Sequence, residues 1–419
     1  MFIVPALWFT ALTLWLWQRH KGYDVCVYMS SLYALVSIFA AIIVLCDMMG
    51  EGGILFFNND AEFGVVPTLL YCTMITLTLL PFHLLYDKDI KRVTTASPLL
   101  LDGLGALLIL VSILNVYLVA DSTMDILSGD LSAVRDSVYL GEATPAQIKA
   151  ETMPFYARFL YYFNVSTLLA LPLLFYNLCF RSKPWWWNLL LFFASLCMPI
   201  AGIQAADRTE FIYYALMLLF TIILFRKHIS RKVKWIMGII GTPMVLLGVI
   251  YVVAVSESRF SETEGGSSAK NFQYAGQGYI NFCYFWEHGN FDKVAAEREF
   301  PLVNHYFYHI DSNAERRNER MGQQGFFISV FATFLGDIML DLTPLGMVLW
   351  ACYYFLLAIL LLRRSHREEF DISEMLLIFL MACIPVFGIF YYRFFAFTYS
   401  FAIVLALAFY LLSILRIRL

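Results

Sequence analysis

Charged residues are scarce in this chain of 419 residues. Only 15% of its residues are Asp, Glu, Lys or Arg, and 60% are hydrophobic, whereas soluble domains average about 25% charged and roughly 45–50% apolar residues. So few charged residues cannot supply the polar surface that a water-soluble protein of this size needs. The formal net charge of −3 also excludes a basic nucleic-acid-binding protein, so no nucleic acid is expected as a partner.

Sequence motifs for soluble cofactors are missing as well. The chain has no Walker A motif, no Rossmann glycine pattern, no H-E-x-x-H and no C-x-x-C, which argues against an ATP-driven pump, a dehydrogenase and a zinc protease. It also lacks the G-x-S-x-G nucleophile elbow. Of its eight cysteines only Cys283 lies clear of the apolar segments, so no disulfide framework is expected. We expect neither a cofactor nor a metal.

Long apolar runs are abundant. The mean hydropathy is +0.69, and apolar runs of about 20 residues, the length that crosses a bilayer as a helix, recur along the chain. The first run has no basic residue before it and no cleavage pattern after it, so we expect it to be retained. The sequence predicts an all-α polytopic integral membrane protein with eleven spans, at 2–17, 25–46, 66–86, 98–120, 155–180, 187–206, 208–225, 234–256, 342–362, 373–391 and 393–415.

Basic residues indicate the orientation of these spans. One set of short connections holds 17 of the 29 Lys and Arg, whereas the alternating connection 47–65 has none. The positive-inside rule then places the N-terminus outside and the C-terminus in the cytoplasm. A twelfth apolar stretch, 325–340, would put Arg363 and Arg367 outside if it crossed. We interpret it as a re-entrant or interfacial segment on the outer side, where it would line a cavity.

The chain divides into three predicted parts: helices at 1–256, a large extracytoplasmic loop at 257–325, and the re-entrant segment with the last helices at 326–419. The loop has thirteen aromatic residues, more than a disordered segment carries, so it should fold. Its start, to residue 269, is rich in Ser, Gly and Glu and is expected to be flexible. Residues 274–286 are expected on the membrane surface, and Ser312 should open a short helix.

Two outer arginines lie between helices with almost no loop. Arg208 follows Asp207 and precedes Thr209-Glu210, and Arg393 follows two tyrosines. Ionisable residues at membrane depth are costly and are candidates for function. The alternative is an arginine that extends to the interface, paired with Asp207 or Glu210.

The densest outer basic cluster lies on the predicted short helix of the loop. It consists of Arg316, Arg317 and Arg320. Guanidinium groups match the geometry of phosphate, so this cluster is a candidate phosphate site. The alternative is a solvated helix whose arginines pair with Glu315 and Glu319.

His305, His309 and Asp337 are the candidate proton-transfer residues. The two histidines are four residues apart and would share one helix face. No third ligand with suitable spacing follows, which argues against a metal, whereas a general base fits because imidazole titrates near neutral pH. The alternative is a surface histidine among aromatics. Asp337 lies in the twelfth apolar stretch, where it could cap a half-helix, pair with an arginine or act on substrate.

At the level of layout the chain resembles the Wzy-type polymerases of oligosaccharide repeat units. The resemblance covers the whole chain but rests on short motifs, and the Asp-Phe-Gly form of the last one is not present. The features that carry it are the Trp-rich first helix with its basic turn at Leu14–Lys21, the glycine-to-arginine motif from Gly202 to Glu210 with Arg208-Thr209, the loop 257–325, and the stretch from Asp337 to Gly346.

The resemblance implies a metal- and nucleotide-independent membrane glycosyltransferase of the bacterial inner membrane. It would polymerise undecaprenyl-pyrophosphate-linked repeat units on the outer face, for O-antigen (lipopolysaccharide), capsule or exopolysaccharide. Its partners would be that lipid-linked glycan, the lipid bilayer and a chain-length regulator protein. The implied pyrophosphate-binding residues are Arg208, Arg316, Arg317, Arg320 and Arg393. The implied catalytic residues are Arg208, His305, His309 and Asp337, and the implied sugar-stacking residues are Tyr279, Trp286, Tyr306 and Tyr308.

Three alternatives remain open at this stage. An O-antigen ligase has the same architecture and donor but transfers the glycan to lipid A-core, and a histidine in the large loop is typical of ligases. A polyprenyl-phosphate-dependent glycosyltransferase would carry paired acids in the first outer loop, where none are adjacent. A non-enzymatic flippase or transporter would spread charges through its central helices, whereas the charges here gather on the predicted outer face.

Overall fold

The computed structural model describes residues 1–48, 61–85, 92–95, 97–129, 131–140, 143–260, 266–291, 296–297, 299–309, 314–364 and 369–415. The chain forms two compact units. The first comprises Met1–Asp89, Phe260–Arg364 and Met381–Ala396, and the second Ile90–Arg259, Ser365–Leu380 and Phe397–Leu419. Helices make up 83% of the structure, as the apolar periodicity predicted.

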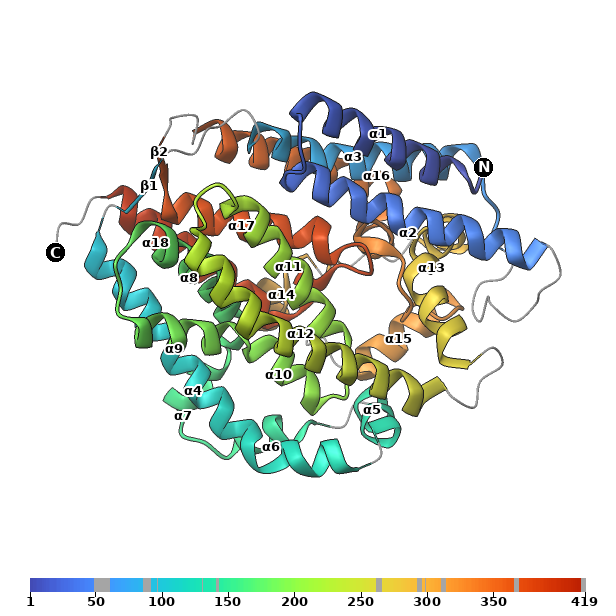
Figure 1. Ribbon diagram of the computed structural model, residues 1–419. Coiled ribbons are helices and arrows are strands. Elements are labelled where there is room, and N and C mark those ends of the chain that lie inside the picture. The colour runs from blue at the N-terminus through green and yellow to red at the C-terminus, as the bar shows by residue number, and fades with distance from the viewer. Residues whose placement is uncertain are drawn as a thin grey trace. The chain divides into compact units, whose positions relative to one another are not determined.

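The first unit contains ten complete helical elements among the described residues. They are α1 (Val4–His20), α2 (Val25–Met48), α3 (Val65–Leu79), η1 (Leu80–Leu85), α13 (Gly266–His288), α14 (Pro301–Val303), η3 (Asn304–Tyr308), α15 (Ala314–Gln324), α16 (Thr333–Arg364) and η4 (Arg393–Phe395). The last turns of α17 (Ile372–Phe387) also belong to it. Helix α2 packs against α1 and α13, and α16 packs against α3 and α13 (Figure 1).

The second unit holds the remaining elements. They are β1 (Arg92–Thr94), α4 (Pro98–Ser128), α5 (Leu131–Leu140), α6 (Pro145–Glu151), α7 (Phe155–Tyr161), η2 (Asn164–Leu169), α8 (Ala170–Phe180), α9 (Trp185–Ser195), α10 (Cys197–Gln204), α11 (Thr209–Phe225), α12 (Arg231–Phe260), β2 (Glu369–Asp371), the start of α17, and α18 (Phe397–Ile414). Helix α4 packs against α9 and α10. Strands β1 and β2 pair in parallel, with Val93 opposite Phe370.

Seven helices within the described residues are long and apolar enough to cross a membrane, or up to eight if the bent pair α7 and η2–α8 is one span. The fold class is therefore confirmed as an all-α membrane protein, but the count of eleven is not. Helices α11 and α17 are apolar but have only 17 and 16 residues, fewer than the roughly 20 that span the hydrocarbon core.

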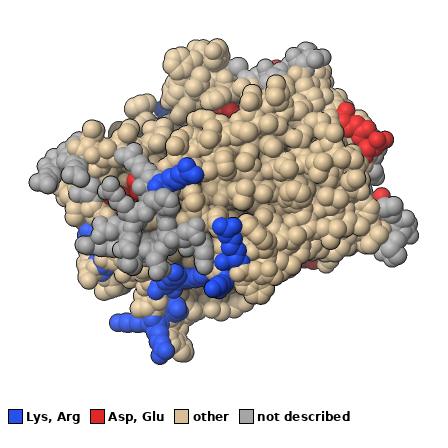
Figure 2. Space-filling view, turned by 90° about the horizontal axis from the view of Figure 1, so that it is seen from above, with Lys and Arg blue, Asp and Glu red and all other residues tan. Residues whose placement is uncertain are grey.

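Charged side chains are few in the view of Figure 2, where Lys and Arg lie toward one side and Asp and Glu at the opposite edge. Apolar side chains of α12 such as Trp235, Ile239 and Leu247 are well exposed. Wide uncharged helical surfaces are stable in contact with lipid hydrocarbon, so a membrane location follows. The direction in which the chain crosses stays a prediction.

The large loop differs from the sequence prediction at its start. Helix α12 continues to Phe260, and residues 261–265, in the part expected to be flexible, lie outside the described residues. Residues 274–286, expected on the membrane surface, belong to α13 and supply buried side chains such as Phe282 and Phe285. A helix this rich in aromatics buries them against neighbouring helices, because that removes more apolar area from water than an interface does.

The apolar stretch at 325–340 is not a separate segment. From Thr333 it forms the first part of α16, which runs to Arg364 across a kink at Thr343, where φ is 72°. Pro344 follows the kink and cannot donate a backbone hydrogen bond. The Thr343 hydroxyl accepts from the Gly346 N–H at 3.2 Å and so caps the helical turn that follows the kink. Whether this part enters the membrane as a re-entrant segment stays a prediction.

Candidate functional site

The turn between α10 and α11 in the second unit carries Arg208. The turn is tight: the Asp207 N–H donates to the Gly202 carbonyl at 2.8 Å, and Ala206 has a φ of 44°. A Cβ on Gly202 would lie 2.9 Å from the Asp207 carbonyl oxygen and 2.8 Å from Cβ of Glu210. A side chain does not fit there, so the glycine of the predicted motif is needed for close backbone approach.

Arg208 is buried, with 8% of its surface exposed, at the residue that precedes α11. Its Nη1 donates to the hydroxyl of Ser256 on α12. Asp207 caps the same helix, because its Oδ1 accepts from the Thr209 N–H at 2.9 Å. The N-terminus of a helix favours negative charge, and the buried Glu210 also lies in this first turn.

The sequence analysis did not single out Arg135 of α5. Its Nη2 lies 3.5 Å from Oδ2 of Asp207, and its Nη1 donates to the Ala205 carbonyl at 3.2 Å. A second guanidinium thus lies at the turn that carries Arg208. One signal was available, since Arg135 is one of two basic residues in the otherwise acidic segment 121–154.

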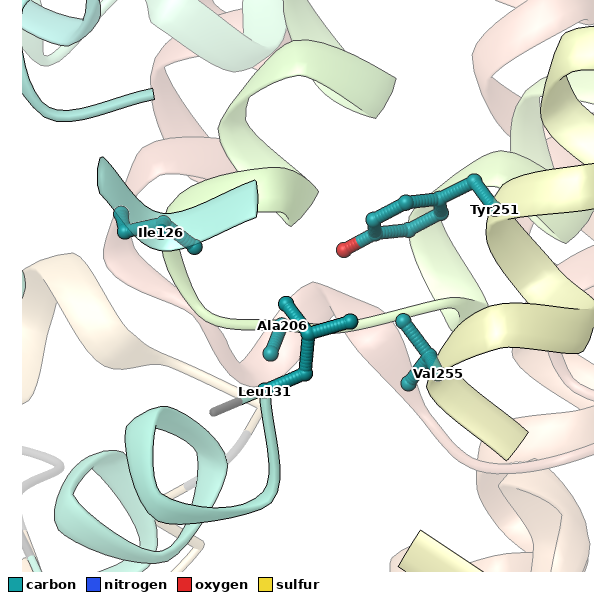
Figure 3. Close-up of a cluster of buried hydrophobic side chains, with 5 residues drawn as sticks. All are labelled: Ile126, Leu131, Ala206, Tyr251 and Val255. Atoms are coloured by element: carbon teal, nitrogen blue, oxygen red, sulfur yellow. The ribbon is translucent and has the colours of Figure 1, made fainter. Parts of the chain in front are cut away.

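An apolar cluster adjoins this turn. Figure 3 shows its five buried side chains: Ile126, Leu131, Ala206, Tyr251 and Val255. The Tyr251 hydroxyl points into the cluster and has no hydrogen-bond partner among the described residues. Charge interactions are stronger in such a low-dielectric setting than in water. We name Arg135, Asp207, Arg208, Tyr251 and Ser256 the arginine turn site.

Arg316 of α15, in the first unit, is already held by carboxylates. Its guanidinium donates to Glu297 and, from Nη1, to Glu319 at 2.6 Å. The hydrogen bonds to Glu297 and then to Glu319 raise the pKa of Arg316 above its ordinary value. The alternative of a mixed-charge helix therefore describes Arg316 better than an open phosphate site does. The side chain of Arg317, and Ser312 with its cap, lie outside the described residues.

Arg320 and Asp337 hold the kinked helix α16 in place. Arg320 pairs with Asp341, their Nη2 and Oδ1 atoms being 2.7 Å apart, and 1% of the Asp341 side chain is exposed. Asp337 is buried and accepts from the Tyr392 N–H at 2.7 Å. Burial, and then the nearby carboxylates of Glu299 and Asp341, raise the pKa of Tyr392. Each acid thus ties α16 to another segment of the first unit.

The two candidate histidines do not share a regular helix face. His305 lies in the π-helical turn η3, and His309 ends it with a φ of 54°, which is left-handed backbone. The His305 ring packs edge-on against Tyr306 at 4.9 Å, and His309 is exposed. No group of three metal-ligating side chains is present in the described ranges.

The candidate aromatic residues divide into exposed and buried side chains. Tyr306 and Tyr308 are 57% and 67% exposed. Trp286 is half-buried. Tyr279 is a correction: it lies in the core, 4.9 Å from the Tyr71 ring, because α13 packs against α2 and α3.

Arg393 is held by its neighbour in the chain. Its Nη1 donates to the Tyr391 hydroxyl at 2.7 Å, and its guanidinium lies 5.7 Å from the Tyr391 ring centre. The guanidinium therefore lies near an aromatic ring, which suits it because the flat cation stacks on π-faces.

No protein-family model, curated protein or solved structure matches this chain.

Proposed function

We propose that the chain is a membrane glycosyltransferase that polymerises undecaprenyl-pyrophosphate-linked oligosaccharide repeat units on the outer face of the bacterial inner membrane. The glycans would be O-antigen, capsule or exopolysaccharide. The observation that carries the proposal is the buried Arg208 guanidinium at the N-terminus of α11. A buried arginine at the end of an apolar helix is costly unless it is paired, and it is a candidate for binding an anion.

The reaction needs charge stabilisation on the leaving group. An acceptor hydroxyl oxygen attacks the anomeric carbon, the bond from that carbon to pyrophosphate breaks, and undecaprenyl pyrophosphate leaves with the electron pair. A base takes the hydroxyl proton. Arg208 would stabilise the charge that develops on pyrophosphate. His305 or His309, in the first unit, is the candidate for this base.

The loop residues have supporting roles in this proposal. Tyr306 and Tyr308 are exposed aromatics of the kind that stack on sugar rings. Arg393, in the first unit, is a separate candidate for binding phosphate. Arg316 and Arg320 would have to release Glu297 and Asp341 before binding an anion, so we place them behind Arg208. Asp337 would position α16.

The experiment is reconstitution of the full chain in liposomes with undecaprenyl-pyrophosphate-linked repeat units as the only substrate. We expect a ladder of lipid-linked glycans without nucleotide sugar. Arg208→Ala should lower the rate about 100-fold or more, the usual cost of removing one charge-stabilising donor. Arg158→Ala, at an exposed arginine of α7, is the matched control and should keep the wild-type ladder.

Other outcomes would redirect the proposal. A single product formed only when lipid A-core is added would favour an O-antigen ligase, which the exposed His309 also suits. Movement of the lipid between leaflets without any new glycosidic bond would favour a transporter. A normal ladder from Arg208→Ala would remove the basis of the proposed site.

A further inference from the structure

We propose that Arg135 and Tyr251 complete a phosphate-binding subsite with Arg208, in which the Asp207 carboxylate occupies the anion position until phosphate displaces it. The inference deepens the proposed function and rests on it, since it takes the pyrophosphate of the lipid-linked glycan as the ligand. It adds two residues from α5 and α12 that the family resemblance does not supply.

Arg208 and Arg135 both belong to the surroundings of the turn between α10 and α11. Arg208 extends from the turn itself to Ser256 of α12, and Arg135 reaches the turn from α5 through Asp207 and the Ala205 carbonyl. Both side chains are largely shielded, with 8% of Arg208 and 15% of the Arg135 side chain exposed. Two arginines and two acidic residues, Asp207 and the buried Glu210, lie at this helix N-terminus, where unpaired backbone N–H groups favour an anion.

The contact between Arg135 and Asp207 is loose. Their closest atoms are 3.5 Å apart, whereas a strong charge-assisted hydrogen bond is about 2.7–2.9 Å long. A phosphate carries more negative charge and more acceptor oxygens than a carboxylate. Phosphate should therefore compete well for Arg135, while Asp207 keeps its second role as the cap of Thr209.

Tyr251 supplies an independent sign of a ligand. It is 9% exposed, and its hydroxyl has no hydrogen-bond partner among the described residues. It interacts electrostatically with Asp207 and with Arg135, and Figure 3 shows the hydroxyl directed toward the Ala206 side of the cluster. A buried hydroxyl left without a partner is unfavourable, and a phosphate oxygen at this position would accept its proton.

The test measures binding to the full chain in lipid nanodiscs. The probes are undecaprenyl pyrophosphate and, separately, inorganic pyrophosphate, so that a lipid-borne and a free anion are told apart. Tyr251→Phe should weaken binding about 10-fold, because a hydrogen bond to a charged group is lost, but it should not lower Tm, since no partner is left behind. Arg135→Met should weaken binding at least as much.

Asp207→Asn is the sharpest variant. Asparagine caps a helix as well as aspartate does, so the turn should hold. If Asp207 competes with phosphate, removing its charge should tighten binding several-fold. Tyr117→Phe, at an exposed tyrosine of α4, and Arg158→Met are the matched controls and should bind as wild type.

The outcomes separate the subsite from the proposed function. Weaker binding by Tyr251→Phe at unchanged Tm supports the subsite, even if wild-type protein makes no glycan ladder, in which case only the proposed function fails. Wild-type affinity of both Tyr251→Phe and Arg135→Met for both probes overturns the subsite, even if ladders form. Weaker binding by Asp207→Asn overturns the competing role of Asp207. Binding of the lipid alone assigns the site to a lipid-linked anion.

Discussion

At the residue scale, carboxylate partners decide which arginines of this chain can bind an anion. Arg316 and Arg320 each meet a carboxylate at close distance, 2.7 Å for Arg320 and Asp341. Arg135 meets Asp207 only at 3.5 Å. From sequence alone the cluster on α15 was a phosphate candidate beside Arg208, because sequence shows the density of arginines but not the acids that the fold brings to them.

Breaking the Arg320–Asp341 pair should destabilise the first unit. Asp341→Asn removes the Arg320–Asp341 ion pair from a buried place, and removing one member of a buried pair costs about 3–5 kcal/mol. The measurement is thermal unfolding in detergent. Arg320→Met combined with Asp341→Leu should recover most of the lost Tm, since both charges are then gone. A Tm equal to wild type for Asp341→Asn would mean that the pair does not hold α15 to α16.

At the element scale, close contact between α13 and α2 depends on Gly276. A Cβ there would lie 2.6 Å from Cδ1 of Ile43 and 2.7 Å from backbone atoms of Phe39 and Ala40. Backbone cannot move aside as a flexible side chain can. The sequence shows this glycine only as one of 23, and nothing in its neighbours reveals a helix crossing.

Gly276→Ala should therefore lower Tm, with a cost of about 1–3 kcal/mol from overpacking. The matched control is Gly322→Ala on α15, where a Cβ meets nothing within 4 Å. That control should be neutral or stabilising by up to about 1 kcal/mol, because alanine favours helix more than glycine does. Equal behaviour of the two variants in a thermal scan would contradict the close helix contact.

The kink in α16 is another feature that the pattern of apolar residues did not locate. Sequence predicted a break between 340 and 342, and the structure has one helix bent at Thr343. Apolar residues continue through the bend: Ile338 before it is buried, whereas Leu345 and Leu349 after it are 69% and 61% exposed. Pro344 was the available signal, since proline inside a helix usually marks a kink.

At the scale of the whole molecule, the direction of the chain in the membrane is the main open prediction. The positive-inside rule places the loop with Tyr308 outside and the basic turn with Lys227 in the cytoplasm. Both side chains are exposed. In a variant without native cysteines, Tyr308→Cys should react with a membrane-impermeant maleimide in intact spheroplasts.

Lys227→Cys is the counterpart in the same background, and it should react only after the membrane is opened. Retained assembly of the cysteine-free variant is checked first by its elution and Tm in detergent. The reverse labelling pattern would invert the predicted topology and would place the arginine turn site on the cytoplasmic side.

The sequence by itself determined the class of this protein and the position of Arg208. Composition and the length of the apolar runs suffice to assign the class. Each membrane-spanning segment has to be apolar and to form its own backbone hydrogen bonds, so the requirement can be read from each segment separately. Tertiary structure decided which helices are long enough to span, that Tyr279 is buried in the core, and that Arg316 and Arg320 are held by acids. It also decided that Arg135 and Tyr251 meet at the turn of Arg208. Such contacts depend on distances between residues far apart in the chain, and no local pattern of charge or hydropathy contains them.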